Sequence, residues 1–184
     1  MGKNLLKKGN NVCLRDARLS DSEIYLKWMQ EGEWREFDAP WERKDLDEGK
    51  IKNRFKQLYL GEKTEPRKRA IICLPERKPI GWVNRYFEEE KDEKFFLGID
   101  ICEDDHLNRG VGTEALSLWI DYLFDNSEVR RLRLNTYSFN DRMKRVAEKL
   151  GFMKENTDKK AVCWQGKWID RERYVLPRRE WNKR

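Results

Sequence analysis

The chain has 184 residues, a length that fits one domain with a buried core. Its formal net charge is +6, and 40% of its residues are charged, with both signs interspersed. The sequence has no apolar run long enough to span a membrane and no signal-peptide core near Met1, and its four cysteines lack metal-ligand spacing. We therefore expect a reduced cytoplasmic protein with no membrane association and no metal site.

A basic excess is also typical of proteins that bind nucleic acid. Here the Lys and Arg residues alternate with acids, and no known nucleic-acid-binding motif occurs. We therefore expect no nucleic-acid partner, and salt-sensitive binding to generic DNA would contradict this expectation.

The first part of the chain predicts a strand, two helices and two further strands. Residues 12–15 form the short strand, and Ser20 with Glu23 matches a capping box for a helix that ends at Gly32. Residues 33–41 have neither helical nor strand periodicity. A second helix is predicted from about Asp45, followed by strands over residues 69–74 and 79–87.

A glycine loop between a strand and a helix organises the second part. The apolar run 95–101 predicts the strand, and residues 107–113 (LNRGVGT) form the loop. Apolar residues then recur at helical spacing, namely Ala115, Leu116, Trp119, Ile120, Leu123 and Phe124. Glycines two apart at a helix N-terminus favour an anion-binding loop, although ordinary turns also use glycine.

The remaining segments predict a strand over 131–136, a helix capped by Asn140 and ended by Gly151, and a hairpin over 161–176. The basic end, residues 178–184, is expected to fray. The order β-α-α-β-β-β-α-β-α-β-β predicts an α/β (α+β) fold with a mixed, mostly antiparallel sheet flanked by helices. We expect a single domain over residues 1–184, with its core at about 12–181.

Three motifs in this order resemble the GNAT N-acetyltransferase superfamily. Residues 107–112 (LNRGVG) are similar to its acetyl-CoA loop, Q/R-x-x-G-x-G/A, and residues 140–152 are similar to its N-x-x-[S/A]…E-K-x-G-F segment. The ending, residues 166–181, resembles the branch of ribosomal-protein-alanine and spermidine acetyltransferases. The resemblance implies an acyltransferase that uses acetyl-CoA as co-substrate, without a metal.

The chain departs from the family pattern at three positions. Leu107 replaces the usual Gln or Arg, and Met143 stands where Ser is frequent. Ala147 stands where many relatives have the Tyr that is proposed to protonate the leaving thiolate. Orientation of the reactants contributes roughly 7–11 kcal/mol of a barrier, and one acid or base about 10²–10⁴-fold, so activity is still expected.

The resemblance implies that backbone N–H groups from Arg109 to Thr113 hold the coenzyme pyrophosphate. It also implies that the pantetheine arm pairs near residues 99–102, where the N–H of Ile101 or Cys102 polarises the thioester carbonyl. Asn140 matches an Asn that contacts the coenzyme, and its alternative role is helix capping alone. The expected coenzyme-binding residues are Ile101, Cys102, Leu107, Asn108, Arg109, Gly110, Val111, Gly112, Thr113 and Asn140.

The acceptor must lose a proton, and Asp100 is the first candidate for the catalytic base. It alternates with Ile99 and Ile101 in an apolar strand, and the segment resembles aminoglycoside 6′-acetyltransferases, whose strand Asp is the proposed base. The alternative is a strand-end carboxylate paired with an Arg. Glu103 is the second candidate, with a solvated loop residue as its alternative.

The resemblance places acceptor specificity in the loop between the first two helices and in the C-terminal hairpin. The loop residues expected to bind the substrate are Trp34, Glu36, Asp38 and Trp41, with Trp164 and Trp168 opposite. Aromatic rings with carboxylates suit a cationic amine, and ordinary packing is the alternative role of each tryptophan.

These observations predict an acetyl-CoA-dependent N-acetyltransferase that acts on a primary amine. The acceptor is a small polycation, such as a polyamine or an aminoglycoside, or a protein N-terminus. The alternative is a non-catalytic acyl-CoA-binding regulatory protein, which Met143 and Ala147 motivate. The sequence leaves a homodimer open.

Overall fold

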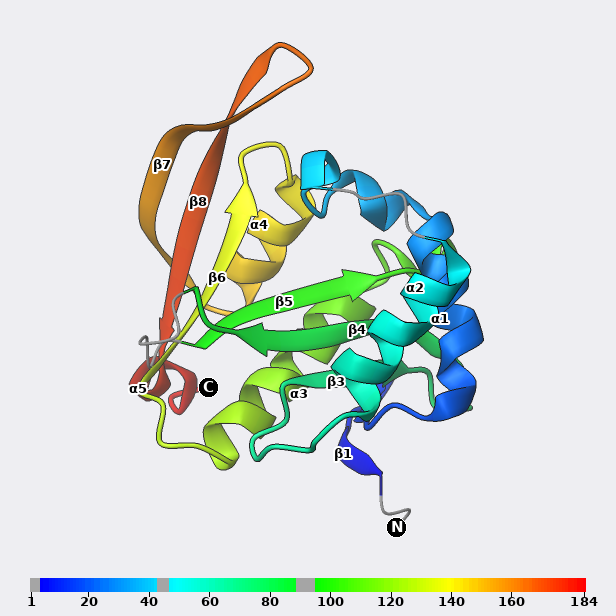
Figure 1. The fold of residues 1–184 in the computed structure, drawn as a ribbon. Helices are drawn as coiled ribbons and strands as arrows, with labels where there is room; N and C mark the ends of the chain where they lie inside the picture. The colour runs from blue at the N-terminus through cyan, green and yellow to red at the C-terminus, as the bar shows by residue number, and fades with distance from the viewer. Residues whose placement is uncertain (1–3, 43–46, 89–94) are drawn as a thin grey trace. The chain divides into compact units, whose positions relative to one another are not determined.

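A computed structural model describes residues 4–42, 47–88 and 95–184 of the chain. Eight strands form one mixed sheet in the order β1-β2-β3-β4-β5-β6-β8-β7 (Figure 1). The pairing of β5 with β6 is parallel, whereas β1–β2, β2–β3, β3–β4, β6–β8 and β7–β8 are antiparallel. The predicted fold class is therefore confirmed. Two compact units divide the chain, one of residues 1–84 and 99–126 and the other of residues 85–98 and 127–184.

The first unit is built on an antiparallel ladder of short strands. These are β1 (Leu5–Lys8), β2 (Cys13–Arg15), β3 (Arg69–Cys73) and most of β4 (Pro79–Tyr86), joined by the last residues of β5 (Phe95–Ile101). Cys13 pairs with Cys73, and Ile71 pairs with Trp82. Four of the five β3 residues are buried, so this strand lies in the core of the unit.

Helices cover the strands of this unit. They are α1 (Ser22–Gln30), α2 (Glu48–Phe55, continued as a π-turn over Lys56–Leu60) and α3 (Val111–Asp125), with short 3₁₀ turns at Leu19–Asp21, Glu33–Glu36, Pro40–Glu42 and Asp104–His106. In Figure 1, α3 lies behind β3 and β4. An aromatic cluster joins α1 and α2 to β4, with Tyr25, Trp28 and Phe55 packed around the buried Trp82 and one another.

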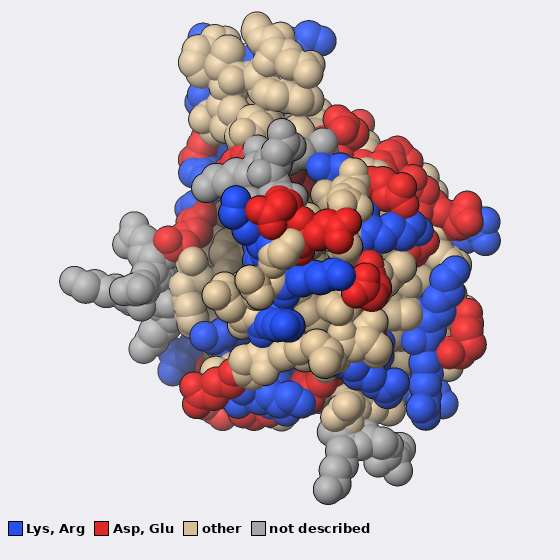
Figure 2. Space-filling model, turned by 45° about the vertical axis from the view of Figure 1, so that its right-hand side comes forward, with Lys and Arg blue, Asp and Glu red and all other residues tan. Residues whose placement is uncertain are grey.

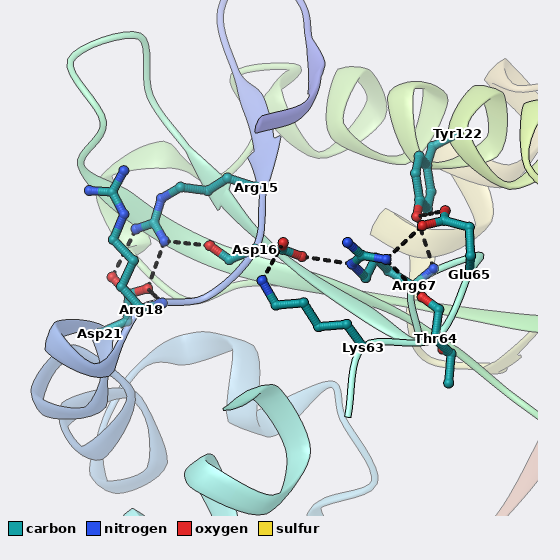
Figure 3. Close-up of polar contacts among 9 residues, drawn as sticks. All are labelled: Arg15, Asp16, Arg18, Asp21, Lys63, Thr64, Glu65, Arg67 and Tyr122. Carbon is teal, nitrogen blue, oxygen red and sulfur yellow. Dashed lines mark hydrogen bonds and ion pairs between the residues drawn. The ribbon is translucent and has the colours of Figure 1, made fainter. Parts of the chain in front are cut away.

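A buried polar network holds the start of α1 (Figure 3). The Arg15 guanidinium donates to both carboxylate oxygens of Asp21, at 2.7 and 2.8 Å, and both side chains are 6% exposed. Next to them, the Asp16 carboxylate accepts from Lys63 at 2.7 Å and from Arg67 Nε at 3.0 Å. The network fixes β2 to the helix start and to the loop before β3.

The second unit contains the first half of β5, the strands β6 (Arg131–Tyr137), β7 (Met153–Trp164) and β8 (Lys167–Pro177), and the helices α4 (Asp141–Lys149) and α5 (Arg178–Trp181). The parallel β5–β6 ladder pairs residues 95–97 with residues 132–134. The β6–β8 ladder runs from Arg131–Pro177 to Tyr137–Arg171. An ion pair between Arg133 and Glu155, with Nε to Oε2 at 2.9 Å, adds a side-chain tie on this sheet.

The N-terminal region differs from the sequence analysis at two places. No element was predicted for residues 5–8, which form strand β1 by pairing with β2. Ser20 does not cap α1: the helix begins at Ser22 after a 3₁₀ turn, and Asp21 accepts from the Arg18 N–H at 2.7 Å. The predicted start of the second helix, Asp45, lies outside the described residues, and the helix begins at Glu48.

Three further segments differ from their predictions. Residues 33–42 contain two 3₁₀ turns, although no regular structure was expected. The C-terminal hairpin starts at Met153 rather than at residue 161. The polar first half of β7 forms a strand because it pairs with β8. The basic end is an ordered short helix, because Arg178 donates from Nε to the Val129 carbonyl at 2.9 Å and from Nη2 to the Ser127 carbonyl at 2.6 Å.

Candidate active site

The glycine loop ends at the N-terminus of α3. Gly110 is the N-cap residue with φ +82°, and Asn108 also has a positive φ of 59°. A Cβ on Gly110 would meet nothing within 4 Å, so glycine serves the backbone conformation here rather than a close contact. Because the N-cap has no side chain, the first N–H groups of α3 form a donor set suited to an anion.

The loop packs against the end of β5. A Cβ on Gly112 would lie 3.5 Å from Cγ1 of Ile101, an ordinary contact. The Cys102 N–H donates to the Ile80 carbonyl at 2.8 Å. Of the two backbone N–H groups expected to polarise the thioester, that of Cys102 is therefore already used within the protein.

Gly81 on β4 permits a very close approach to the candidate base. A Cβ at this position would lie 2.0 Å from the carbonyl oxygen of Asp100 and 3.1 Å from Cα of Ile101. Any larger residue would displace the end of β5. Gly81 therefore fixes the backbone from which the Asp100 carboxyl group projects.

The Asp100 side chain lies beside Trp82, whose indole donates to its carboxyl group. Burial and the negative charge of Asp38 raise the pKa of Asp100 well above its ordinary value. The Trp82 hydrogen bond and the positive charge of Arg69 oppose this rise. The carboxyl group is thus poised to titrate at higher pH than a solvated Asp.

Glu103 has a different environment. Its Oε1 accepts from Trp28 Nε1 at 2.7 Å, and Lys27 lies 3.2 Å from its Oε2. Burial raises the pKa of Glu103, but the hydrogen bonds from Trp28 and Lys27 outweigh burial and bring the pKa below its ordinary value. These contacts give Glu103 the role of tying α1 to the end of β5.

Cys102 is a buried thiol. Burial and the charges of Asp100 and Glu103 raise its pKa well above the ordinary value. A protonated thiol is a poor nucleophile, which agrees with direct transfer rather than a covalent intermediate.

The segment 32–38 is anchored over the end of β5. Gly32 has φ +112°, and a Cβ there would lie 2.8 Å from Trp34 Cδ1 and 3.2 Å from the Cys102 carbonyl oxygen. The Glu33 N–H donates to Asp104 Oδ1 at 2.9 Å. The Trp34 ring meets that of Trp82 edge-on at 5.0 Å. The buried Trp34 Nε1 has no hydrogen-bond partner among the described residues.

The other expected acceptor residues differ in exposure. Glu36 and Asp38 are exposed, whereas Trp41 is half-buried. Trp164 and Trp168 pair with Lys167 and Cys163 in the β7–β8 hairpin of the second unit, and Trp168 is 61% exposed. In the loop, Leu107 is half-buried, and Asn108 and Arg109 are exposed.

Asn140 caps α4, as predicted, and its Oδ1 accepts from the Met143 N–H at 3.0 Å. Ala147 is fully buried within this helix. The residue at the position of the family Tyr is therefore a methyl group in a packed interior, without a proton to donate.

Sequence reasoning missed Trp82 and Gly81. Trp82 occupies an apolar strand, where a tryptophan looks like any core residue. Gly81 beside it was the available signal, because glycine within a strand marks a close approach of another backbone.

On the face drawn in Figure 2, Lys and Arg side chains are interspersed with Asp and Glu. The described residues contain no group of three or more His, Cys, Asp and Glu side chains placed to hold a metal ion. No helix among them is long and apolar enough to cross a membrane.

The family of this chain is shown by its similarity to known proteins. Residues 11–153 match the model of the acetyltransferase (GNAT) domain. The chain belongs to the GNAT acetyltransferase family. Among curated proteins, it is similar to the probable N-acetyltransferase YjcK of Bacillus subtilis, with 27% identity over 171 residues, which cover 90% of this chain and 93% of that protein. The prophage-derived uncharacterized N-acetyltransferase YokL of the same organism is 24% identical over 112 residues, covering 61% of this chain and 63% of that protein.

Solved GNAT structures share the fold. The spermidine N-acetyltransferase of Vibrio cholerae, in complex with CoA and spermine, superposes with a TM-score of 0.79 at 15% identity, covering 95% of this chain and 99% of that chain. A GNAT acetyltransferase from Bacillus anthracis gives a TM-score of 0.76 at 17% identity, covering 94% and 98%. The chain is thus an acetyltransferase of the GNAT fold, in a family that uses acetyl-CoA.

Proposed function

We propose that this chain moves the acetyl group of acetyl-CoA directly to a primary amine, and that the acceptor is a small polycation. The observation that carries the proposal is the carboxyl group of Asp100, held by Trp82 at the end of β5 next to the glycine loop and the acidic segment 33–42. The proposal includes two further expectations from the sequence. Residues 1–184 form one domain, and this domain is located in the cytoplasm.

The coenzyme is bound mainly by backbone groups. The N–H groups from Arg109 to Thr113 receive the pyrophosphate at the positive end of α3, a role that needs no particular side chain. This explains how Leu107 is tolerated. Since the Cys102 N–H is already donated to Ile80, the Ile101 N–H is the donor that we assign to the thioester carbonyl oxygen. The coenzyme contact expected of Asn140 stays a prediction.

Asp100 acts as the general base that removes a proton from the acceptor amine. An amine enters as an ammonium ion, whose positive charge favours the ionised form of the carboxyl group and counteracts the effect of burial. The carboxylate then takes a proton from the ammonium, and the amine lone pair forms the new C–N bond. The C–S bond breaks, and the thiolate leaves or takes a proton from water, because Ala147 supplies none.

The segment that covers the end of β5 supports the proposed acceptor class. It carries the exposed acids Glu33, Glu36, Asp38 and Glu42 beside the half-buried Trp41, whereas Trp34 is buried against Trp82. Carboxylates attract a cation with several charges, and aromatic faces stabilise an ammonium group. The structural neighbour from Vibrio cholerae was crystallised with spermine, which supports a polyamine as the first acceptor to test.

A non-catalytic acyl-CoA-binding regulatory protein is the second candidate. The buried Ala147 in place of the family Tyr favours it. This candidate predicts coenzyme binding without turnover on any amine.

The test is release of free thiol from acetyl-CoA with spermidine, an aminoglycoside, and peptides that begin with Ala or Ser. Coenzyme A binding is measured in parallel by calorimetry. We expect turnover with spermidine or the aminoglycoside. Turnover with the peptides alone would replace the polycation by a protein N-terminus. Binding without turnover on any amine would favour the regulator, and absence of binding would overturn both candidates.

A further inference from the structure

The turn between β1 and β2 is fastened to the first turn of α3 by one carboxylate. Glu114 Oε1 accepts from the Asn10 N–H at 2.6 Å and from the Asn11 N–H at 2.9 Å. Its Oε2 accepts from Asn11 Nδ2 at 2.8 Å. We call these contacts the Glu114 clasp. The hydrogen bonds outweigh burial and bring the pKa of Glu114 below its ordinary value, so the group is ionised at neutral pH.

The clasp adjoins the glycine loop. Glu114 follows Thr113 directly, and its own N–H donates to the Gly110 carbonyl at 3.1 Å, which closes the first turn of α3. Gly110 has φ +82° and open space where a Cβ would lie, so no side-chain packing at that position holds the loop. The clasp is therefore a tie that fixes the start of the helix from outside.

We propose that Glu114 is a positioning residue for the coenzyme: by holding the β1–β2 turn against α3, it keeps the backbone N–H groups of the glycine loop in their binding geometry. This inference rests on the proposed coenzyme site at that loop. It assigns Glu114 no contact with the coenzyme.

The sign of the effect separates positioning from simple electrostatics. A carboxylate in the first turn of α3 repels a pyrophosphate at the same helix end, so charge alone predicts that Glu114→Ala tightens coenzyme binding. A positioning role predicts that Glu114→Ala weakens coenzyme binding. Without the clasp the glycine loop is less ordered, and ordering it on binding costs part of the binding free energy.

Gly9 offers an independent variant that keeps every functional group. A Cβ on Gly9 would lie 2.3 Å from Glu114 Oε1, the mobile end of a side chain, so Gly9→Ala displaces the carboxylate without removing its charge. Asp125→Asn is the matched control. Lys7 Nζ lies 2.6 Å from Asp125, which ties the same N-terminal hairpin to the far end of the same helix.

The experiment measures the Kd of coenzyme A by calorimetry for the wild type and the three variants, together with kcat and the KM for acetyl-CoA. We expect Glu114→Ala and Gly9→Ala to weaken binding by about ten-fold and to raise the KM with kcat within about two-fold, whereas Asp125→Asn stays near the wild type. A merely structural role would lower the active fraction and hence kcat without moving the KM.

Unchanged or tighter binding in Glu114→Ala would overturn the inference while the wild type still binds. If Glu114→Ala fails to fold, Gly9→Ala decides by the same measurements. A wild type that does not bind coenzyme A would instead overturn the proposed function, and this inference with it.

Discussion

The indole of Trp82 donates a hydrogen bond to the carboxyl group of Asp100. The two residues come from neighbouring strands, and Trp82 is itself buried among Tyr25, Trp28 and Trp34. A hydrogen bond to the ionised form of a carboxyl group lowers its pKa. Trp82 thus limits the rise in the pKa of Asp100 that burial causes.

Replacing Trp82 by Phe is expected to move the acid limb of the pH profile of kcat/KM to higher pH. The aromatic packing is largely kept, but the hydrogen bond that favours the carboxylate is lost. Activity at pH 7 should fall by about ten-fold, which corresponds to the ~1.5 kcal/mol of a hydrogen bond to a charged group. The measurement is kcat/KM for the amine between pH 5.5 and 9.

Trp28→Phe is the matched control for that variant. It removes an indole N–H from the same aromatic cluster, but that N–H donates to Glu103 Oε1 at 2.7 Å rather than to Asp100. We expect no shift of the acid limb. Equal losses in both variants without a shift would mean that Trp82 acts through packing alone.

Asp100→Asn is expected to lower kcat by about 10²–10⁴-fold, the usual contribution of a general base. Coenzyme A should bind with unchanged affinity, since the Asn keeps the shape of the side chain. Glu103→Gln serves as the comparison, because Gln still accepts the Trp28 hydrogen bond, and its kcat should stay within about ten-fold of the wild type. The opposite ranking of the two variants would make Glu103 the base.

The raised pKa of Asp100 also predicts how stability depends on pH. The folded protein binds this proton more tightly than the unfolded chain, whose Asp titrates near about 3.9. The stabilisation is complete below that value and is lost as pH rises through the folded pKa. Urea unfolding at pH 5, 7 and 8.5 should show that Asp100→Asn gains stability relative to the wild type with rising pH. A difference that does not grow with pH would contradict the shift.

Local patterns were sufficient where an element depends on its own sequence. The apolar spacing of residues 115–124 predicted the inner face of α3, and all six of those apolar residues are buried. Asn140 caps α4 because its short polar side chain reaches the N–H three residues on, a contact within one turn. The strand before the glycine loop was likewise predicted with its observed bounds, Phe95–Ile101.

Contacts between distant residues were beyond such patterns. Ser20 with Glu23 has the spacing of a capping box, but Asp21 accepts the turn's N–H group and pairs with Arg15 instead. Trp82 gains its role only through Asp100, which lies on another strand. The Glu114 clasp joins residues more than a hundred positions apart, and nothing in the sequence around Glu114 marks its partners.

The buried Arg15–Asp21 ion pair provides a prediction about the stability of the protein. Both side chains are 6% exposed, so Arg15→Met leaves a buried carboxylate without its bidentate partner. The expected cost is about 3–5 kcal/mol in the free energy of unfolding, measured with urea. The double variant Arg15→Met with Asp21→Asn should recover much of that loss, because neither position then holds an unpaired buried charge and Asn still accepts from the Arg18 N–H. If the losses of the two single variants simply add in the double variant, the pair contributes no coupling, and the start of α1 is held by packing alone.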